Sequence, residues 1–255
     1  MTAMHVEEME DGSRCLVYPL AEDILTHAIM RPPGSKGSIP SVSVAMLHVA
    51  LGLQELHAQG FCHRDVKHRN VLGMRRGQGP WKLADLDASS LQGEEVTEFM
   101  GYPWSVWSPR VRIGAWPTAV PSPEHARHLF ALWARRGEVE PLLASREHDL
   151  FQLGVLIYEA VCRRLLLAGR PGMEVLEELA SDRPLQMPQC EGGGGGGELE
   201  ALLGLASELI SKQPEKRPRM EEVIERLRTI SSGETSGRDG EPECKKLDCC
   251  FIVKV

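Results

Sequence analysis

Apolar residues recur at every third or fourth position along several stretches of the chain, which is the repeat of an amphipathic helix. In residues 41–57 the repeat is made by Val42, Ala45, Met46, Val49, Leu53 and Leu56. Gly60 follows as a helix stop, and residues 199–210 and 220–230 show the same repeat. Residues 149–162 are apolar nearly all round, which is typical of a helix buried in the middle of a domain. The pattern predicts a mainly α-helical fold.

Short apolar runs bounded by Pro and Gly add a small β component to this prediction. One run covers residues 14–20, and two more, residues 71–72 and 81–84, flank a Gly-rich turn over residues 74–80. A short helix is expected to begin within residues 23–28. These strands are too few for a sheet that dominates the fold.

Composition and charge exclude several classes of protein. The chain has 255 residues, of which 42% are hydrophobic and 25% charged, and its formal net charge is −7. Such an acidic balance argues against nonspecific binding to nucleic acid, which requires Lys and Arg to neutralise phosphates. No stretch reaches the ~18 consecutive apolar residues expected of a transmembrane helix. Residues 1–12 lack the basic and apolar regions of a signal peptide.

The cysteines indicate a compartment. The chain has 7 of them, an odd number, scattered through apolar segments. We expect reduced thiols in a cytoplasmic protein rather than a disulfide framework. No Cys or His cluster has the spacing of a zinc site.

The candidate chemistry lies in residues 63–70, which read His-Arg-Asp-Val-Lys-His-Arg-Asn, and in a carboxylate further on. The segment combines an acid (Asp65), a base (Lys67) and an amide (Asn70), and Asp85 follows the next predicted strand. Phosphoryl transfer needs such a set. One carboxylate orients a hydroxyl, a lysine neutralises the transferring phosphate, and an amide and a second carboxylate hold magnesium.

This arrangement resembles the catalytic loop of the protein kinase family, whose signature is His-Arg-Asp-x-x-x-x-Asn followed by Asp-Phe-Gly. Ser122-Pro123-Glu124 stands where the family has Ala-Pro-Glu, and the resemblance pairs Glu124 with Arg217 in a buried ion pair. Asp149 matches the family aspartate that hydrogen-bonds the catalytic loop backbone. The long interval between Glu124 and Asp149 suggests an inserted helix over residues 126–136, with His125 on its surface.

The resemblance assigns roles to the catalytic residues. Asp65 is expected to be catalytic, as the base that accepts or orients the substrate hydroxyl. Lys67, also catalytic, stabilises charge beside the γ-phosphate, as in Ser/Thr kinases. Asn70 and Asp85 resemble the two magnesium ligands.

The resemblance also assigns roles around the nucleotide. Leu20 lies in the segment that corresponds to the hinge, Leu72 would form the floor under adenine, and both would contact ATP together with Lys67, Asn70 and Asp85. His63 and Leu86 occupy positions of the hydrophobic spine. Arg64 would bind a phosphate on the activation loop, where the candidate phosphosites are Ser89, Ser90, Thr97, Ser105 and Ser108.

The implied domain organisation has three parts. Residues 14–230 form the kinase-like domain, residues 1–13 an acidic N-terminal segment, and residues 231–255 a disordered tail. The family's Gly-rich phosphate loop, strand lysine and helix glutamate have no counterpart upstream of residue 14. We therefore expect a helical C-lobe with a truncated N-lobe remnant. Asp87 replaces the Gly of Asp-Phe-Gly, which removes a flexible backbone position and adds a negative charge near the metal.

The resemblance implies transfer of the ATP γ-phosphate to a Ser or Thr hydroxyl of a protein, with ATP and Mg²⁺ as cofactors. Two alternatives stay open. One is a catalytically inactive pseudokinase or interaction scaffold, and the other is a fragment of a longer kinase. A partner is expected to cover the apolar top of the C-lobe that a missing N-lobe would expose.

Overall fold

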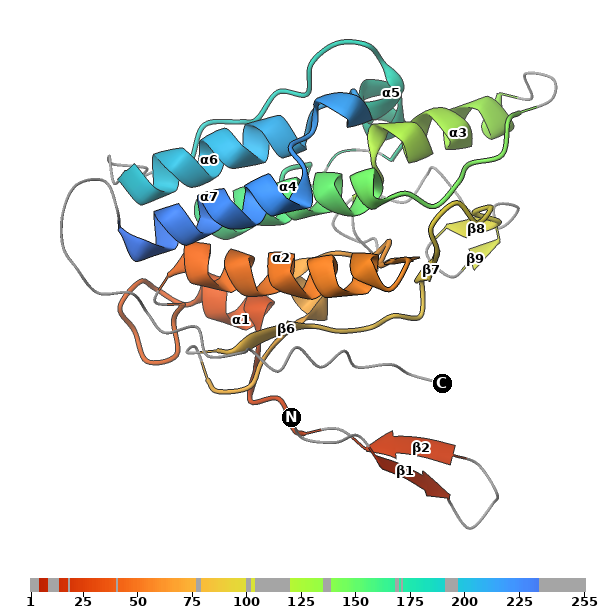
Figure 1. Ribbon diagram of the computed structural model, residues 1–255. Coiled ribbons are helices and arrows are strands. Elements are labelled where there is room, and N and C mark those ends of the chain that lie inside the picture. The colour runs from red at the N-terminus through yellow and green to blue at the C-terminus, as the bar shows by residue number, and fades with distance from the viewer. Residues whose placement is uncertain are drawn as a thin grey trace.

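The computed structural model describes residues 5–8, 14–17, 19–39, 41–76, 79–99, 102–103, 120–134, 139–167, 170, 172–190 and 197–233. Within these residues the chain forms helices and short strands, with the helices making up most of the body (Figure 1). The prediction of a mainly α fold with a small β component is confirmed. No described helix is long and apolar enough to cross a membrane.

The helices follow the predicted periodicity closely. They are α1 (Leu25–Met30), α2 (Val42–Ala58), α3 (Pro123–Trp133), α4 (Arg146–Cys162), α5 (Gly172–Ala180), α6 (Gly197–Leu209) and α7 (Met220–Ser232), with 3₁₀ turns η1 (His68–Asn70) and η3 (Pro214–Lys216). Helix α2 begins where the Ser41 side chain accepts a hydrogen bond from the Val44 amide at 3.2 Å. It ends before Gly60, whose φ of 85° is left-handed. Helix α5 was not predicted.

The strands form small separate sheets. They are β1 (His5–Glu8), β2 (Arg14–Val17), β3 (Asp23–Ile24), β4 (Phe61–Cys62), β5 (Val71–Gly73), β6 (Trp81–Leu83), β7 (Ser90–Leu91), β8 (Glu98–Phe99) and β9 (Tyr102–Pro103). The largest described sheet is antiparallel, in the order β3–β5–β6, and pairs Val71 with Leu83. It lies beneath α2, and the β1–β2 hairpin lies apart from the helices (Figure 1).

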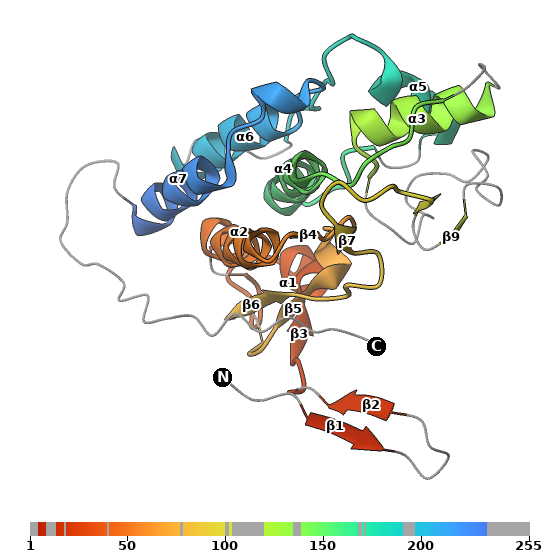
Figure 2. The same cartoon turned by 45° about the vertical axis from the view of Figure 1, so that its right-hand side comes forward.

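Helix α4 is the centre of the helical body. All its residues from His148 to Ala160 are buried. Helices α2 and α6 pack against it, and α7 packs on α2 (Figure 2). The contact with α6 is close at Gly154, where an added Cβ would lie 2.6 Å from the Leu209 Cβ. The burial of residues 148–160 confirms what their mostly apolar sequence predicts.

One cysteine expectation is wrong. Cys162, the last residue of α4, is disulfide-bonded to Cys190, with Cα atoms 5.0 Å apart. The segment that contains Cys190 therefore lies against α4. A second contact joins the two, since the Tyr158 hydroxyl donates a hydrogen bond to the Pro188 carbonyl at 3.0 Å. Cys62 is free and buried, and burial raises the pKa of its thiol to about 12. Spacing along the sequence did not reveal that Cys162 and Cys190 meet.

Candidate active site

The β5–β6 hairpin brings Asn70 and Asp85 together. The strands pair in register from Val71 opposite Leu83, and the Ala84 amide donates to the Asn70 carbonyl at 2.8 Å. Asp85 follows directly, is exposed, and has a φ of 69°. A left-handed φ in a non-glycine residue is uncommon and concentrates at functional sites. The two residues proposed as metal ligands therefore share the open end of one hairpin.

Asp65, Lys67 and Asn70 form one hydrogen-bonded group. The Lys67 Nζ lies 2.6 Å from the Asp65 Oδ2. The Asn70 side chain donates through Nδ2 to both the Asp65 carbonyl and its Oδ2, each at 3.0 Å. Asp65 and Asn70 are buried, at 7% and 6% exposure, whereas Lys67 is half-buried. The structure thus brings three of the predicted residues into direct contact.

Helix α4 holds this loop through Asp149. Its Oδ2 accepts from the His63 amide at 2.8 Å and lies 2.7 Å from the His57 Nε2, and its Oδ1 accepts from the Arg64 amide at 2.7 Å. Complete burial raises the pKa of this carboxyl, but the hydrogen bond and charge of His57 outweigh burial and leave the pKa below its ordinary value. The predicted hydrogen bonds from Asp149 to the loop backbone are confirmed.

Two further α4 side chains reach the loop, and the sequence analysis missed both. The Gln152 Oε1 accepts from the Val66 amide at 2.8 Å, and its Nε2 donates to the Arg64 carbonyl at 3.1 Å. The His148 Nε2 lies 3.3 Å from the same carbonyl. A polar pair spaced by four residues within an apolar helix was the available signal, because such residues share one face.

The Glu124–Arg217 ion pair is confirmed. It is bidentate, with N···O distances of 2.6 and 2.7 Å, and Arg217 also donates to the Glu147 carbonyl at 2.6 Å. The guanidinium carbon stands 5.2 Å from the centre of the Phe151 ring. Burial raises the pKa of Glu124, but the hydrogen bond and charge of Arg217, together with a backbone hydrogen bond and the charge of His148, bring the pKa below its ordinary value. Arg217 therefore links the first turn of α3, through Glu124, to the first turn of α4, through Glu147.

The expectation for His125 is wrong. α3 begins at Pro123, directly after Ser122, so His125 lies in its first turn and is 2% exposed. Its ring stacks on His148 with centroids 3.8 Å apart, and its Nδ1 lies 3.0 Å from the Ser122 hydroxyl oxygen. Burial lowers the pKa of both histidines. The expected inserted helix exists, but it starts at the Ser-Pro-Glu motif itself.

The structure describes Arg64 and the two predicted spine residues, His63 and Leu86, but not every candidate phosphosite. The Arg64 Nη1 donates to the Ser90 hydroxyl at 3.3 Å. His63 is fully buried, with its Nε2 3.1 Å from the Ala84 carbonyl oxygen, whereas Leu86 is half-buried. Ser105 and Ser108 lie outside the described residues.

The nucleotide positions are less gathered than the catalytic ones. Leu72 is half-buried in the middle of β5, whereas Leu20 is 88% exposed. The chain from Leu20 does pass beside β5, because the Glu22 amide donates to the Gly73 carbonyl at 3.0 Å. Leu20 and Leu72 therefore belong to neighbouring segments, but neither of them lines a cavity described here.

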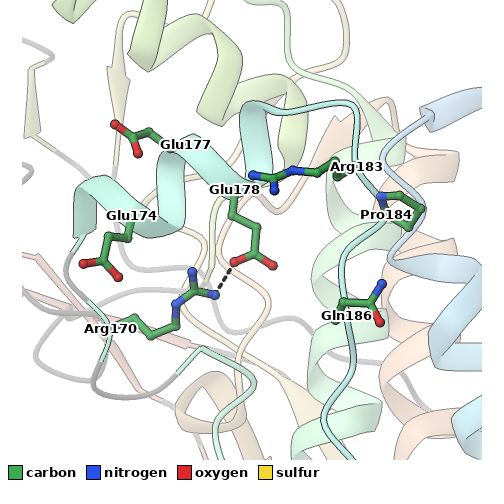
Figure 3. A pocket seen from close by; sticks show the side chains of 7 residues that line it. All are labelled: Arg170, Glu174, Glu177, Glu178, Arg183, Pro184 and Gln186. Carbon is green, nitrogen blue, oxygen red and sulfur yellow. Dashed lines mark hydrogen bonds and ion pairs between the residues drawn. The ribbon is translucent and has the colours of Figure 1, made fainter.

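A cavity of about 570 Å³ lies elsewhere, on α5. Figure 3 shows Glu174, Glu177 and Glu178 on this helix, with Arg170 ion-paired to Glu178 and Arg183 beside them. None of the predicted catalytic residues lines it. This cavity is separate from the candidate active site.

The donor set fits magnesium. Asn70 donates to Asp65 through Nδ2, so its Oδ1 is the atom that would bind a metal, and the Asp85 carboxylate is exposed at the same end of the hairpin. Magnesium prefers oxygen ligands and keeps waters and phosphate oxygens in its remaining positions, so two protein ligands suffice. Among the described residues no group of three or more His, Cys, Asp or Glu could hold a metal by itself.

The helical body and the loop held by α4 resemble the helical domain of a kinase, and the known proteins that match this chain are kinases as well. Residues 4–110 match the family model described as "Protein kinase domain". The chain is 26% identical over 214 residues to Protein kinase PINOID from rice (Oryza sativa), covering 73% of this chain. It is 26% identical over 218 residues to mouse Tyrosine-protein kinase ZAP-70, covering 84% of this chain. It is also 25% identical over 229 residues to Serine/threonine-protein kinase PkaA from Streptomyces coelicolor, covering 86% of this chain.

These matches support a eukaryotic-type protein kinase family for this chain. It spans less than half the length of these curated relatives: 42% of PINOID, 30% of ZAP-70 and 34% of PkaA.

Proposed function

We propose that this chain transfers the γ-phosphate of ATP to a Ser or Thr hydroxyl of a protein. The observation that supports this most is the buried group of Asp65, Lys67 and Asn70, hydrogen-bonded together and adjacent along the hairpin to Asp85. Phosphoryl transfer depends on positioning and charge stabilisation, and these residues supply both.

Each residue has a role that its contacts support. Asp65 orients the substrate hydroxyl and accepts its proton, and the bonds from Lys67 and Asn70 hold its carboxylate in one orientation. Lys67 provides positive charge beside the transferring phosphate. Asn70 and Asp85 would hold magnesium, which when bound neutralises charge on the phosphates. Leu72 and Leu20 would contact the nucleotide base from β5 and from the preceding segment.

The choice of Ser or Thr over Tyr rests on Lys67. A lysine two residues after the catalytic aspartate is typical of Ser/Thr kinases, whereas tyrosine kinases usually differ there. PkaA is a serine/threonine kinase by name and ZAP-70 a tyrosine kinase, so the relatives do not decide the acceptor. Phosphoamino acid analysis of the product distinguishes the two.

A second candidate function is a non-catalytic interaction module. Its support is the exposure of two apolar side chains beside β3 and α1: Leu20 at 88% and Met30 at 58%. A partner, or another part of a longer kinase, would cover them.

The first experiment measures transfer from labelled ATP with magnesium to dephosphorylated casein by wild type and Asp65→Asn. We expect transfer by wild type and its loss in the variant, because Asn cannot accept the hydroxyl proton. Asp182→Asn, on an exposed residue, is the matched control and should stay active. Activity retained in Asp65→Asn would refute the mechanism.

The second experiment measures stabilisation by magnesium and ATP, which does not require turnover. Ligand at about 100 times its dissociation constant stabilises the folded state by ~2.7 kcal/mol. The stabilisation should depend on magnesium and disappear in Asp85→Ala. A folded wild-type chain that gains no stability from magnesium and ATP would favour the interaction module.

Two broader proposals accompany the activity. We propose residues 14–230 as the kinase-like domain, between an N-terminal segment (1–13) and a tail (231–255). We also propose the cytoplasm as its location, where the Cys162–Cys190 disulfide would be an exception because such bonds are rare in the cytosol. Fluorescence microscopy of the tagged chain in cells tests this, and a signal confined to the secretory pathway would refute it.

A further inference from the structure

Gln152 is an unusual residue for its position. It lies in the middle of α4, is 2% exposed, and is preceded by Phe151 and followed by Leu153, both fully buried. Burying an amide without hydrogen bonds destabilises the folded state. Its retention here calls for specific partners.

The partners are all backbone groups outside α4. The Oε1 accepts from the Val66 amide at 2.8 Å, and the Nε2 donates to the Arg64 carbonyl at 3.1 Å and to the Val120 carbonyl at 3.4 Å. The orientation of the amide is determined by these partners, because a flipped amide would aim its NH₂ at an N–H and its oxygen at two carbonyls.

Two of these contacts flank Asp65. Arg64 precedes it and Val66 follows it, and Arg64 has a φ of 67°. The Asp65 amide donates to the His63 Nδ1 at 3.3 Å and its carbonyl accepts from Asn70 at 3.0 Å. The backbone around Asp65 is therefore over-determined, which is the condition for maintaining a strained residue such as Arg64.

The third contact leads to a different segment. Val120 is buried and stands two residues before Ser122, where α3 and the ion pair of Glu124 begin. Asp149 holds the loop from the same helix, but its contacts are to His57, His63 and Arg64. Among the described contacts of these two side chains, only those of Gln152 join the catalytic loop to the residues before Ser-Pro-Glu.

We propose that Gln152 is a positioning residue that fixes the backbone around Asp65 relative to α4 and Val120, and so holds the base in one orientation. This rests on the proposed function, in which Asp65 receives the substrate hydroxyl. The side chain touches no reacting atom and acts through the backbone at Arg64, Val66 and Val120. Misplacing a reacting group by about 1 Å can lower a rate about a hundredfold.

The test compares Gln152→Met with Gln152→Glu in the full chain. Met keeps the length of the side chain but removes every hydrogen bond. Glu keeps an acceptor for the Val66 amide but removes both donors. Gln59→Met is the matched control, because Gln59 is exposed and donates only to Glu55 in the described contacts, at 3.2 Å. Far-UV circular dichroism verifies that each variant is folded.

Amide hydrogen exchange of residues 61–70 gives a readout that needs no activity. We expect exchange at Val66 to rise about tenfold or more in Gln152→Met, since an amide without its hydrogen bond opens more readily. It should stay slow in Gln152→Glu and in Gln59→Met, and exchange in α7 should be the same in all variants. Unchanged exchange at Val66 in folded Gln152→Met would overturn the proposal.

Kinetics supply the second readout. We expect kcat to fall about tenfold to a hundredfold in Gln152→Met, with KM for ATP changed less than about twofold. Gln152→Glu should lower kcat less than Gln152→Met does, because the Val66 contact remains while the contacts to the Arg64 and Val120 carbonyls are lost. If wild type transfers phosphate and Gln152→Met retains its kcat, the proposal is overturned. If wild type is inactive but exchange responds as expected, the contacts of Gln152 are supported and the proposed function fails instead.

Discussion

The two sides of the catalytic loop differ in how they are held. Its underside rests on α4, where Asp149 and Gln152 bind backbone groups of residues 63–66 and both side chains are buried. On the other side Asp85 and Asp87 are exposed at the end of β6. The underside is formed by buried residues of α4. We call the exposed segment with Asp85 and Asp87 the rim, and its negative charges would face a bound ligand.

This difference separates stability from chemistry. Substitutions on the underside should unfold the protein or misalign the loop, because they remove partners of buried polar groups. Substitutions at the rim should leave folding unchanged and alter only ligand binding. A kinase-like domain can therefore lose its activity at the rim and still keep its fold.

The largest effect is expected for Asp149→Ala, which breaks the underside. It removes the acceptor of the His63 and Arg64 amides and the partner of His57. Removing one partner of a buried charged pair costs about 3–5 kcal/mol. Urea unfolding followed by circular dichroism measures this loss. A decrease below about 1 kcal/mol would show that the stability of the loop does not depend on Asp149, because even one net hydrogen bond contributes about that much.

A pH-dependent effect is expected at Glu159, on the same helix. Burial raises the pKa of its carboxyl to about 7, and its Oε2 lies 3.9 Å from the His68 Nε2 in the catalytic loop. The folded pKa of Glu159 lies above the unfolded value of ~4.3. The contribution of the protonated Glu159 carboxyl to stability is therefore complete below about pH 4.3 and is lost as the pH rises through about 7.

Glu159→Gln removes the ionisation and keeps an acceptor for the Leu166 amide, 3.2 Å from Oε1. Its stability advantage over wild type should grow by about 2 kcal/mol between about pH 5 and about pH 8. Thermal or urea unfolding at both pH values measures this, with Glu200→Gln on α6 as the control. An advantage that is the same at both pH values would contradict the assignment.

The smallest effect on folding is expected at the rim, for Asp87→Asn. Asp87 is exposed, so unfolding free energy should change by less than about 0.5 kcal/mol. Magnesium affinity should weaken modestly, since one negative charge near the site is lost. Magnesium titration in the presence of ATP measures the second effect. A large loss of stability would show that the rim is as deeply integrated as the underside.

Local sequence predicted the parts of the structure that depend on local rules. The period of apolar residues located α2 and α4, because each buries a continuous face or surface. The Ser-Pro-Glu motif and Arg217 located an ion pair between residues 93 apart in sequence, since the resemblance supplied the partner. From these signals the helical fold and the contact of Asp149 with the loop were predicted correctly.

The missed features depend on contacts that sequence spacing does not encode. Helix α5 has the right period in Val175, Leu176 and Leu179, but it is only 9 residues long and begins at the Gly of a Pro-Gly pair. His125 is buried because α3 begins one residue after Ser122 and brings it against His148. Polar side chains such as Gln152 become recognisable only when the helix and the loop are seen together.

The anchoring of the loop on α4 has a consequence for the order of folding. The Arg64 amide and its acceptor Asp149 are 85 residues apart, and the Val66 amide and Gln152 are 86 apart. On a ribosome that adds about 5–20 residues per second, the loop emerges several seconds before the helix that orders it. During that interval the newly made chain holds its acidic and basic groups without a fixed geometry. The site can therefore take its final arrangement only after α4 has been synthesised. Contacts between residues this distant in sequence are also slow to form.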